Sequence, residues 1–148
     1  MSSHPDRAPE NIVGRCHCGN LKLHLHWPAT ASLILRVCTC DYCSRQGALW
    51  ISHHAAPVTL SYAEQDQIIA YRFASESADF LVCRRCGILT MARCAAADGQ
   101  RAVVNARTLE NVDLAHYQQA AAHLGDEDLP TRMARRRRDW SPLSMQSP

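Results

Sequence analysis

The chain has 148 residues, of which 47% are hydrophobic and 20% charged, and its formal net charge at pH 7 is +2. This length fits one domain, and this composition excludes a disordered chain. No apolar run reaches the ~20 residues of a membrane-spanning helix, and the charge is too small to indicate nucleic-acid binding. Residues 1–11 contain no apolar block like that of a secretory signal, so we expect a cytoplasmic protein.

Short apolar segments follow one another along the chain after a loose arm at residues 1–11. In the segment 21–27, an apolar side chain at every second position alternates with lysine or histidine, which predicts a half-buried strand. Many short strands separated by turns are typical of an antiparallel all-β domain. Further apolar runs predict strands at 32–37, 48–52, 58–61, 67–73, 80–83, 88–91 and 102–105.

The segment 112–124 (VDLAHYQQAAAHL) predicts the one helical stretch near the C-terminus. Alanine and glutamine favour a helix, and Gly125 follows as a stop. We therefore expect an arm at 1–11, one folded domain at 12–125 and a C-terminal extension at 126–148.

The C-terminal extension is expected to lie outside the core as a solvated tail. It contains five arginines and four acidic residues. This near balance of charge is typical of a poor phosphate binder and disfavours a nucleic-acid patch. A homodimer contact through Trp140 is an alternative role for the segment. The arginines are Arg132, Arg135, Arg136, Arg137 and Arg138.

Eight cysteines in a chain without an export signal are the unusual feature of the composition. A reducing cytoplasm disfavours disulfides, so closely spaced cysteines there are typically metal ligands or redox centres. Short turns can place neighbouring sulfur atoms on one side, and such spacings indicate zinc. Seven of the eight lie in three clusters: Cys16 and Cys18; Cys38, Cys40 and Cys43; Cys83 and Cys86.

Seven thiolates divide most simply into a set of four and a set of three. The pairs Cys16/Cys18 and Cys83/Cys86 would close a tetrahedral site that carries no chemistry. Closing the loop between the pairs costs roughly 4 kcal/mol, whereas a structural zinc contributes on the order of 10–16 kcal/mol. Spacing alone also permits another division: Cys16, Cys18, Cys38 and Cys40 around one ion, and Cys43, Cys83 and Cys86 around the other.

The remaining set, Cys38, Cys40 and Cys43, comes from one local loop. A zinc held by three protein ligands keeps its fourth coordination position for water or substrate, which is typical of a catalytic site. The alternative is a second structural site that a fourth protein ligand closes. The candidates for that ligand are His53, His54 and Cys94.

The order of these motifs resembles the glutathione-dependent formaldehyde-activating enzyme (GFA) family, which also includes centromere protein V. The resemblance extends over about residues 12–110, and all seven clustered cysteines match. The sequence departs from the family pattern at Cys94, at Glu110 and in the long C-terminus. The matching segments are 14–19, 38–45 and 80–87, with further similarity at 47–49, 71–73 and 108–110.

The resemblance implies a β-rich fold of the β-tent type with two zinc ions per chain. In the activity that names the family, glutathione and formaldehyde combine to S-hydroxymethylglutathione, and the enzyme is classed as a carbon–sulfur lyase. The resemblance assigns the ligands as follows: Cys16, Cys18, Cys83 and Cys86 to a structural zinc, and Cys38, Cys40 and Cys43 to a catalytic zinc.

The sequence therefore predicts a zinc-dependent carbon–sulfur lyase that acts on a glutathione-like thiol and an aldehyde, with no nucleic-acid or membrane partner. The thiol is expected to bind as a thiolate and to attack the aldehyde carbonyl. Arg45 is the expected partner for a carboxylate of the thiol, and Arg84 and Arg85 are weaker candidates. The rival from another class is a zinc-stabilised binding module or thiol carrier without catalysis.

Overall fold

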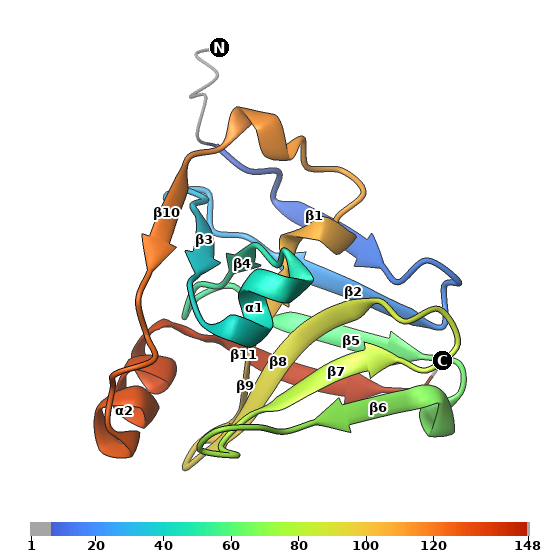
Figure 1. Ribbon diagram of the computed structural model, residues 1–148. Helices are drawn as coiled ribbons and strands as arrows, with labels where there is room; N and C mark the ends of the chain where they lie inside the picture. Colours follow the sequence, from blue (N-terminus) through green and yellow to red (C-terminus); the bar gives the residue numbers. More distant parts are fainter. Residues whose placement is uncertain (1–6, 148) are drawn as a thin grey trace.

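Strands predominate over helices in the computed structural model, which describes residues 7–147 (Figure 1). The described residues contain two α-helices, α1 (Asp41–Gln46) and α2 (Leu129–Asp139), together with three short 3₁₀ turns. The strands are β1 (Asn11–Arg15), β2 (Leu21–His26), β3 (Leu35–Cys38), β4 (Trp50–Ile51), β5 (Val58–Tyr62), β6 (Ile68–Tyr71), β7 (Asp79–Cys83), β8 (Leu89–Ala96), β9 (Gly99–Asn105), β10 (Gln119–Ala122) and β11 (Ser141–Gln146). The all-β prediction is confirmed.

One mixed sheet joins the strands of the described residues in the order β1-β2-β5-β11-β9-β4-β3-β10. β9 also pairs with β8, from which β7 and β6 continue. Pairing is antiparallel except at β10 with β3 and at β11 with β5, which run parallel. An exclusively antiparallel sheet is therefore the wrong expectation, because most of the chain separates the members of these two pairs and allows a parallel crossover.

The alternating pattern of the segment 21–27 produces the predicted half-buried strand. The leucines of β2 are buried and the side chains between them are exposed. Leu23 pairs with Leu60 of β5, and these residues belong to the main core cluster. The same cluster contains Cys16 and Cys83, so core packing fixes the two turns that carry the first cysteine group.

The predicted helix at 112–124 is wrong. Leu114–His116 forms a 3₁₀ turn, and Gln119–Ala122 forms β10, which pairs in parallel with β3. Helix propensity is a weak preference that tertiary pairing overrides, and here β3 offers backbone hydrogen bonds to the passing chain. The pairing places residue 122 directly beside Cys38.

The C-terminal segment is part of the fold, in contrast to the expected tail. α2 occupies Leu129–Asp139, and β11 enters the sheet between β5 and β9 (Figure 1). Leu143 of β11 belongs to the main core cluster. Trp140 is 6% exposed, so its side chain is unavailable for the dimer contact that the sequence suggested.

The N-terminal arm is described only in part, because residues 1–6 of the expected arm lie outside the described residues. Arg7 forms an isolated bridge with Ser32, and Asn11 begins β1. Within residues 7–147, no helix has the length and apolar character that crossing a membrane requires.

Candidate metal centres

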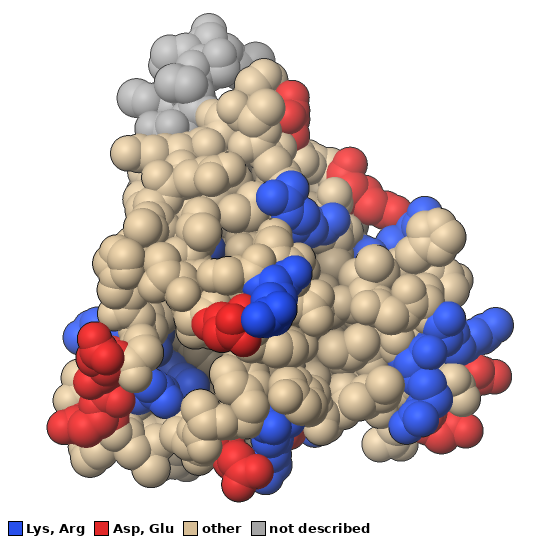
Figure 2. All heavy atoms as spheres, in the orientation of Figure 1, with Lys and Arg blue, Asp and Glu red and all other residues tan. Residues whose placement is uncertain are grey.

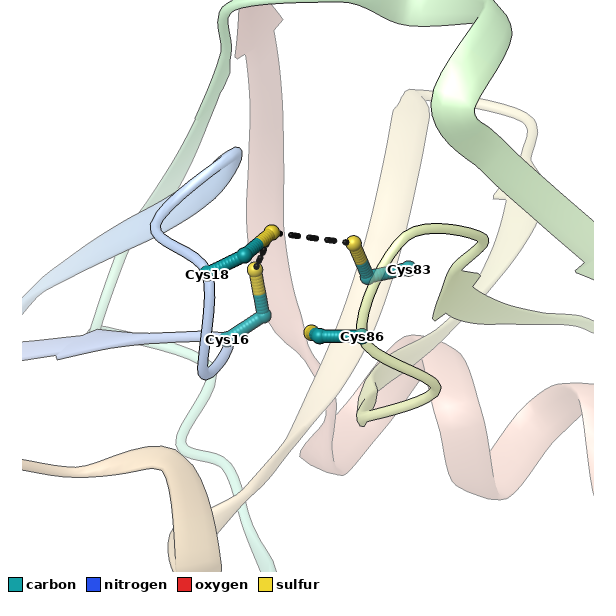
Figure 3. A group of neighbouring side chains, drawn as sticks. All are labelled: Cys16, Cys18, Cys83 and Cys86. Carbon is teal, nitrogen blue, oxygen red and sulfur yellow. Dashed lines mark hydrogen bonds between the residues drawn. The ribbon is translucent and has the colours of Figure 1, made fainter.

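Cys16, Cys18, Cys83 and Cys86 come together from two turns that are distant in the sequence (Figure 3). The first two lie in the turn between β1 and β2, and the others at the turn between β7 and β8. Sγ of Cys18 lies 3.7 Å from Sγ of Cys16 and 3.6 Å from Sγ of Cys83. All four sulfur atoms lie within 4.8 Å of one another.

The geometry of this four-cysteine group fits a tetrahedral metal ion. Sulfur atoms around zinc lie about 3.8 Å apart, because each Zn–S bond is about 2.3 Å long. Gly19 and Gly87 follow the second cysteine of each turn with φ values of 84° and 80°, which only glycine adopts freely. The backbone N–H of Leu21 donates to Sγ of Cys16 over 3.3 Å, so the turn also orients its sulfur atom.

Cys38, Cys40 and Cys43 form a second group, the cysteine tripod, whose sulfur atoms also lie within 4.8 Å of one another. Cys38 ends β3, Cys40 caps the N-terminus of α1, and Cys43 lies in the first turn of that helix. The backbone N–H of Cys43 donates to Sγ of Cys40 over 3.3 Å. The sulfur atoms therefore gather as four plus three, and the other division is not formed.

Hydrogen bonds within the tripod favour negative charge on Cys38 rather than on Cys43. A hydrogen bond from the Cys43 thiol lowers the pKa of Cys38 to about 5, and the charge of Arg135 adds a smaller effect in the same direction. The same hydrogen bond raises the pKa of Cys43. A cation placed among these sulfur atoms would favour the thiolate form in the same direction.

The alternative fourth ligands do not join the tripod. Within residues 7–147, no His, Cys, Asp or Glu brings a fourth ligand atom within 4.8 Å of all three sulfur atoms. His53 stacks on His54 with 4.3 Å between ring centroids, and its Nδ1 accepts a hydrogen bond from the backbone N–H of Ala55. Cys94 is a buried residue of β8 outside both groups.

Two hollows lie against the tripod. One has a volume of about 100 Å³ with Cys38 and Cys43 in its wall, and the other has about 140 Å³ with Cys40 in its wall. Figure 2 shows the surface hollowed between α1 and α2, with basic side chains at the wall. No acidic side chain of residues 7–147 lines either hollow; the charged lining is Arg36, Arg135 and Arg136 in the first, and Arg132 and Arg136 in the second.

Arg45, the predicted carboxylate partner, lies on the outer face of α1. Its side chain is 77% exposed and pairs with Asp41 over 2.9 Å, one helical turn away. It does not line either hollow at the tripod. Of the weaker candidates, Arg85 pairs with Glu64 over 3.5 Å, on the part of the molecule that carries the four-cysteine group.

Sequence reasoning missed the cavity residues from the C-terminal segment. The first hollow is lined by Arg135, Arg136 and Trp140 together with Arg36 of β3. The sequence does contain a helix-start signal before these residues: Asp128 is followed by a proline in the first turn of α2. In the structure, Asp128 caps α2 by accepting a hydrogen bond from the backbone N–H of Thr131. An aspartate followed by proline within two residues is typical of a helix start rather than of a tail.

A mixed β-sheet carrying a four-cysteine group and a three-cysteine group defines a β protein that could hold two metal ions. Residues 11–124 match the sequence model of the glutathione-dependent formaldehyde-activating enzyme (GFA) family, and the chain belongs to this family. No curated protein matches the chain significantly.

A crystal structure of a Rhodobacter sphaeroides protein is similar to this chain in fold. The TM-score is 0.57 with 24% sequence identity, over 73% of this chain and 99% of the other. At this identity the likeness shows the fold alone. α2 and β11 begin after residue 124, so the family match ends before the segment that supplies Arg135, Arg136 and Trp140.

Proposed function

We propose that this protein is a zinc-dependent carbon–sulfur lyase of the GFA type, which acts on the adduct of a glutathione-like thiol and formaldehyde or a related aldehyde. The observation that carries the proposal is the position of the cysteine tripod. Cys38 and Cys43 line a cavity, and within residues 7–147 no fourth protein ligand accompanies the tripod. A ligand set of three beside a cavity is typical of catalytic rather than structural zinc.

Zinc is the ion that both ligand sets favour. Thiolates are soft ligands, and four of them at tetrahedral spacing select zinc or an iron–sulfur cluster. Membership of the GFA family favours zinc over the cluster. The four-cysteine site would join the β1–β2 turn to the β7–β8 turn and so stabilise the sheet.

The net reaction adds the S–H bond of a thiol across the C=O bond of an aldehyde. A C–S bond forms, and the thiol proton ends on the former carbonyl oxygen. When bound at the tripod, zinc would supply a site at which a thiol loses its proton near neutral pH.

The residues of this chain hold and shield the reacting groups. The rings of Trp50, Phe80 and Trp140 form apolar walls of the cavity, so they exclude water from a bound thiol and aldehyde. Arg135 lies near enough to Cys38 to stabilise negative charge on its sulfur atom. The start of α1 positions Cys40 and Cys43, where the backbone N–H of Cys43 donates to Sγ of Cys40, and the end of β3 supplies Cys38.

Exchange NMR tests the activity directly. With glutathione and formaldehyde at equilibrium with their adduct, the zinc-loaded protein should raise the exchange rate in proportion to its concentration. Cys40→Ser should return the rate to that of the uncatalysed mixture, whereas Arg137→Gln, at an exposed position outside both cysteine groups, should retain the acceleration.

The same experiment separates the enzyme from a carrier. Because a thiol and formaldehyde also combine unaided, a protein that binds the thiol without raising the exchange rate would be a non-catalytic module.

We also propose a cytoplasmic location, whether the protein is an enzyme or a carrier. Its eight cysteines form no disulfide among themselves, which favours a reducing compartment.

A further inference from the structure

Arg136 of α2 is a buried cation without a carboxylate partner. Its residue is 7% exposed, and no acidic oxygen of residues 7–147 lies within 4.0 Å of its guanidinium nitrogen atoms. Nη1 donates to the carbonyl oxygen of Ser77 over 3.2 Å and to its Oγ over 2.8 Å. The side chain of Cys94 and the ring of Trp140 also lie against the guanidinium group. These neighbours position the group, but none of them is a carboxylate that would pair with its charge in the buried position.

The Nε atom of Arg136 is also unsatisfied. Among the described residues it is the one buried side-chain nitrogen or oxygen atom without a hydrogen-bond partner. Buried polar groups in native proteins are almost always paired, so this guanidinium, on a residue that lines two hollows, keeps hydrogen-bonding capacity for an acceptor. The donor belongs to a planar guanidinium, whose geometry suits a carboxylate.

The place of Arg136 connects this orphan donor to the tripod. It lines both the 100 Å³ hollow beside Cys38 and Cys43 and the 140 Å³ hollow beside Cys40. A ligand whose sulfur atom meets the tripod could therefore reach this guanidinium from either hollow.

Of the other two arginines in the first hollow, one has a carboxylate partner and one does not. Arg135 forms a two-pronged ion pair with Glu127, with contacts of 2.9 Å from both Nε and Nη2. Arg36 donates to Ser52 Oγ over 3.2 Å and, like Arg136, has no ion pair among the described residues. The cavity wall therefore holds positive charge that no acidic side chain of the lining offsets.

We propose that Arg136 is a specificity-determining residue that binds a carboxylate of the substrate thiol, with Arg36 adding positive charge at the same cavity. The substrate class is then a thiol with a carboxylate a few bonds from its sulfur atom. The proposal rests on the proposed function, because it assumes that a thiol binds at the tripod. Arg136 lies beyond residues 11–124, so this selectivity comes from the C-terminal segment rather than from the family-matched part.

A matched pair of small thiols tests the carboxylate site. 3-Mercaptopropionate and its amide have the same size and differ in charge, and thiolate binding to the cobalt-substituted protein can be followed by visible absorption. We expect the carboxylate to bind at least about 10-fold more tightly than the amide, as a charge-assisted contact in a cavity predicts.

Three variants test whether the preference for the carboxylate thiol over its amide comes from Arg136. Arg136→Gln should reduce the preference to within about 2-fold, and Arg136→Lys, which keeps the charge and loses the planar fork, should retain part of it. Arg137→Gln removes the same charge from an exposed position of the same helix and should leave the preference intact. Circular dichroism shows whether each variant folds.

The outcomes separate this proposal from the proposed function. If both thiols bind the wild-type protein equally, the carboxylate site is wrong while thiol binding stands. If neither thiol changes the cobalt spectrum, the proposed function is wrong as well. If Arg136→Gln does not fold, the wild-type comparison and Arg136→Lys still decide. A preference for the carboxylate thiol that is as strong in Arg136→Lys as in Arg137→Gln would contradict a role for the guanidinium fork.

Discussion

The guanidinium group of Arg136 lies over the ring of Trp140, with 4.8 Å between its central carbon atom and the ring centroid. Both side chains line the cavity beside the cysteine tripod. The backbone N–H of Trp140 also donates to the carbonyl oxygen of Arg136 over 2.8 Å, at the end of α2. The contact therefore fixes the end of α2, the start of β11 and one wall of the cavity together.

Trp140→Ala should remove much of this wall. Trp140 is 6% exposed and packs in a second core cluster with Trp50 and Phe80 among others, so we expect a loss of about 3–5 kcal/mol in the free energy of unfolding. Denaturant unfolding of the zinc-loaded protein measures it. Trp140→Phe should lose less, and a loss below about 1 kcal/mol in Trp140→Ala would contradict the buried position.

Truncation after residue 125 tests the role of the C-terminal segment. Removing residues 126–148 takes β11 from between β5 and β9 and exposes the edges of both strands. We expect the shortened chain to aggregate or to lose cooperative unfolding, because exposed strand edges and core side chains favour association. A shortened chain that unfolds cooperatively at the temperature of the full chain would restore the interpretation of a solvated tail.

The cysteine spacing was enough to find the three clusters, since local turns hold Cys16 with Cys18, and Cys38 with Cys43, within a few residues. Spacing left two divisions of the seven cysteines open, and the structure forms the one that the family resemblance implied. The strands of the first half were also predictable, because the alternation in β2 reports burial on one face of a sheet. These features are local, so a single sequence carries them.

The chain after residue 110 was not predictable in the same way, although the predicted strands at 80–83, 88–91 and 102–105 correspond to β7, β8 and β9. β10 is rich in alanine and forms a strand only because β3 is available to pair with it, and that pairing depends on contacts between distant segments. Arg136 stands among four consecutive arginines, and only the packing of α2 against the cavity distinguishes it from exposed Arg137. The cavity itself is built from β3, α1, β7 and α2 together, which no local pattern indicates.

Glu127→Gln should destabilise the protein through its ion pair with Arg135. The Arg135 hydrogen bond holds the pKa of Glu127 below its ordinary value of 4.5, and both side chains are less than one-fifth exposed. A depressed carboxylate pKa gives stability that is fully present above the ordinary value and is lost as the pH falls through the folded-state pKa.

The loss in Glu127→Gln, roughly 1–3 kcal/mol, should therefore be constant between about pH 6 and 9. Unfolding of the variant and of the wild-type protein across this range measures the difference. A difference that varies with pH in this range would show that another titrating group accounts for the effect.

The two cysteine groups should differ in their effect on stability. Cys83→Ser and Cys40→Ser should each lower the zinc content from two ions to one. Cys83→Ser should lose more stability, because its site joins turns separated by 65 residues, whereas the tripod spans one local loop. Elemental analysis and thermal unfolding measure the two effects, and equal destabilisation by both variants would contradict a structural role confined to the first group.

The most direct test of the open ligand position is a crystal structure of the zinc-loaded protein, with zinc located by anomalous diffraction. We predict zinc at both cysteine groups, with Cys38, Cys40 and Cys43 as the protein ligands of the second ion and a solvent molecule or added thiol as its remaining ligand. A protein side chain completing the coordination of that ion, or no ion at the tripod, would contradict the account.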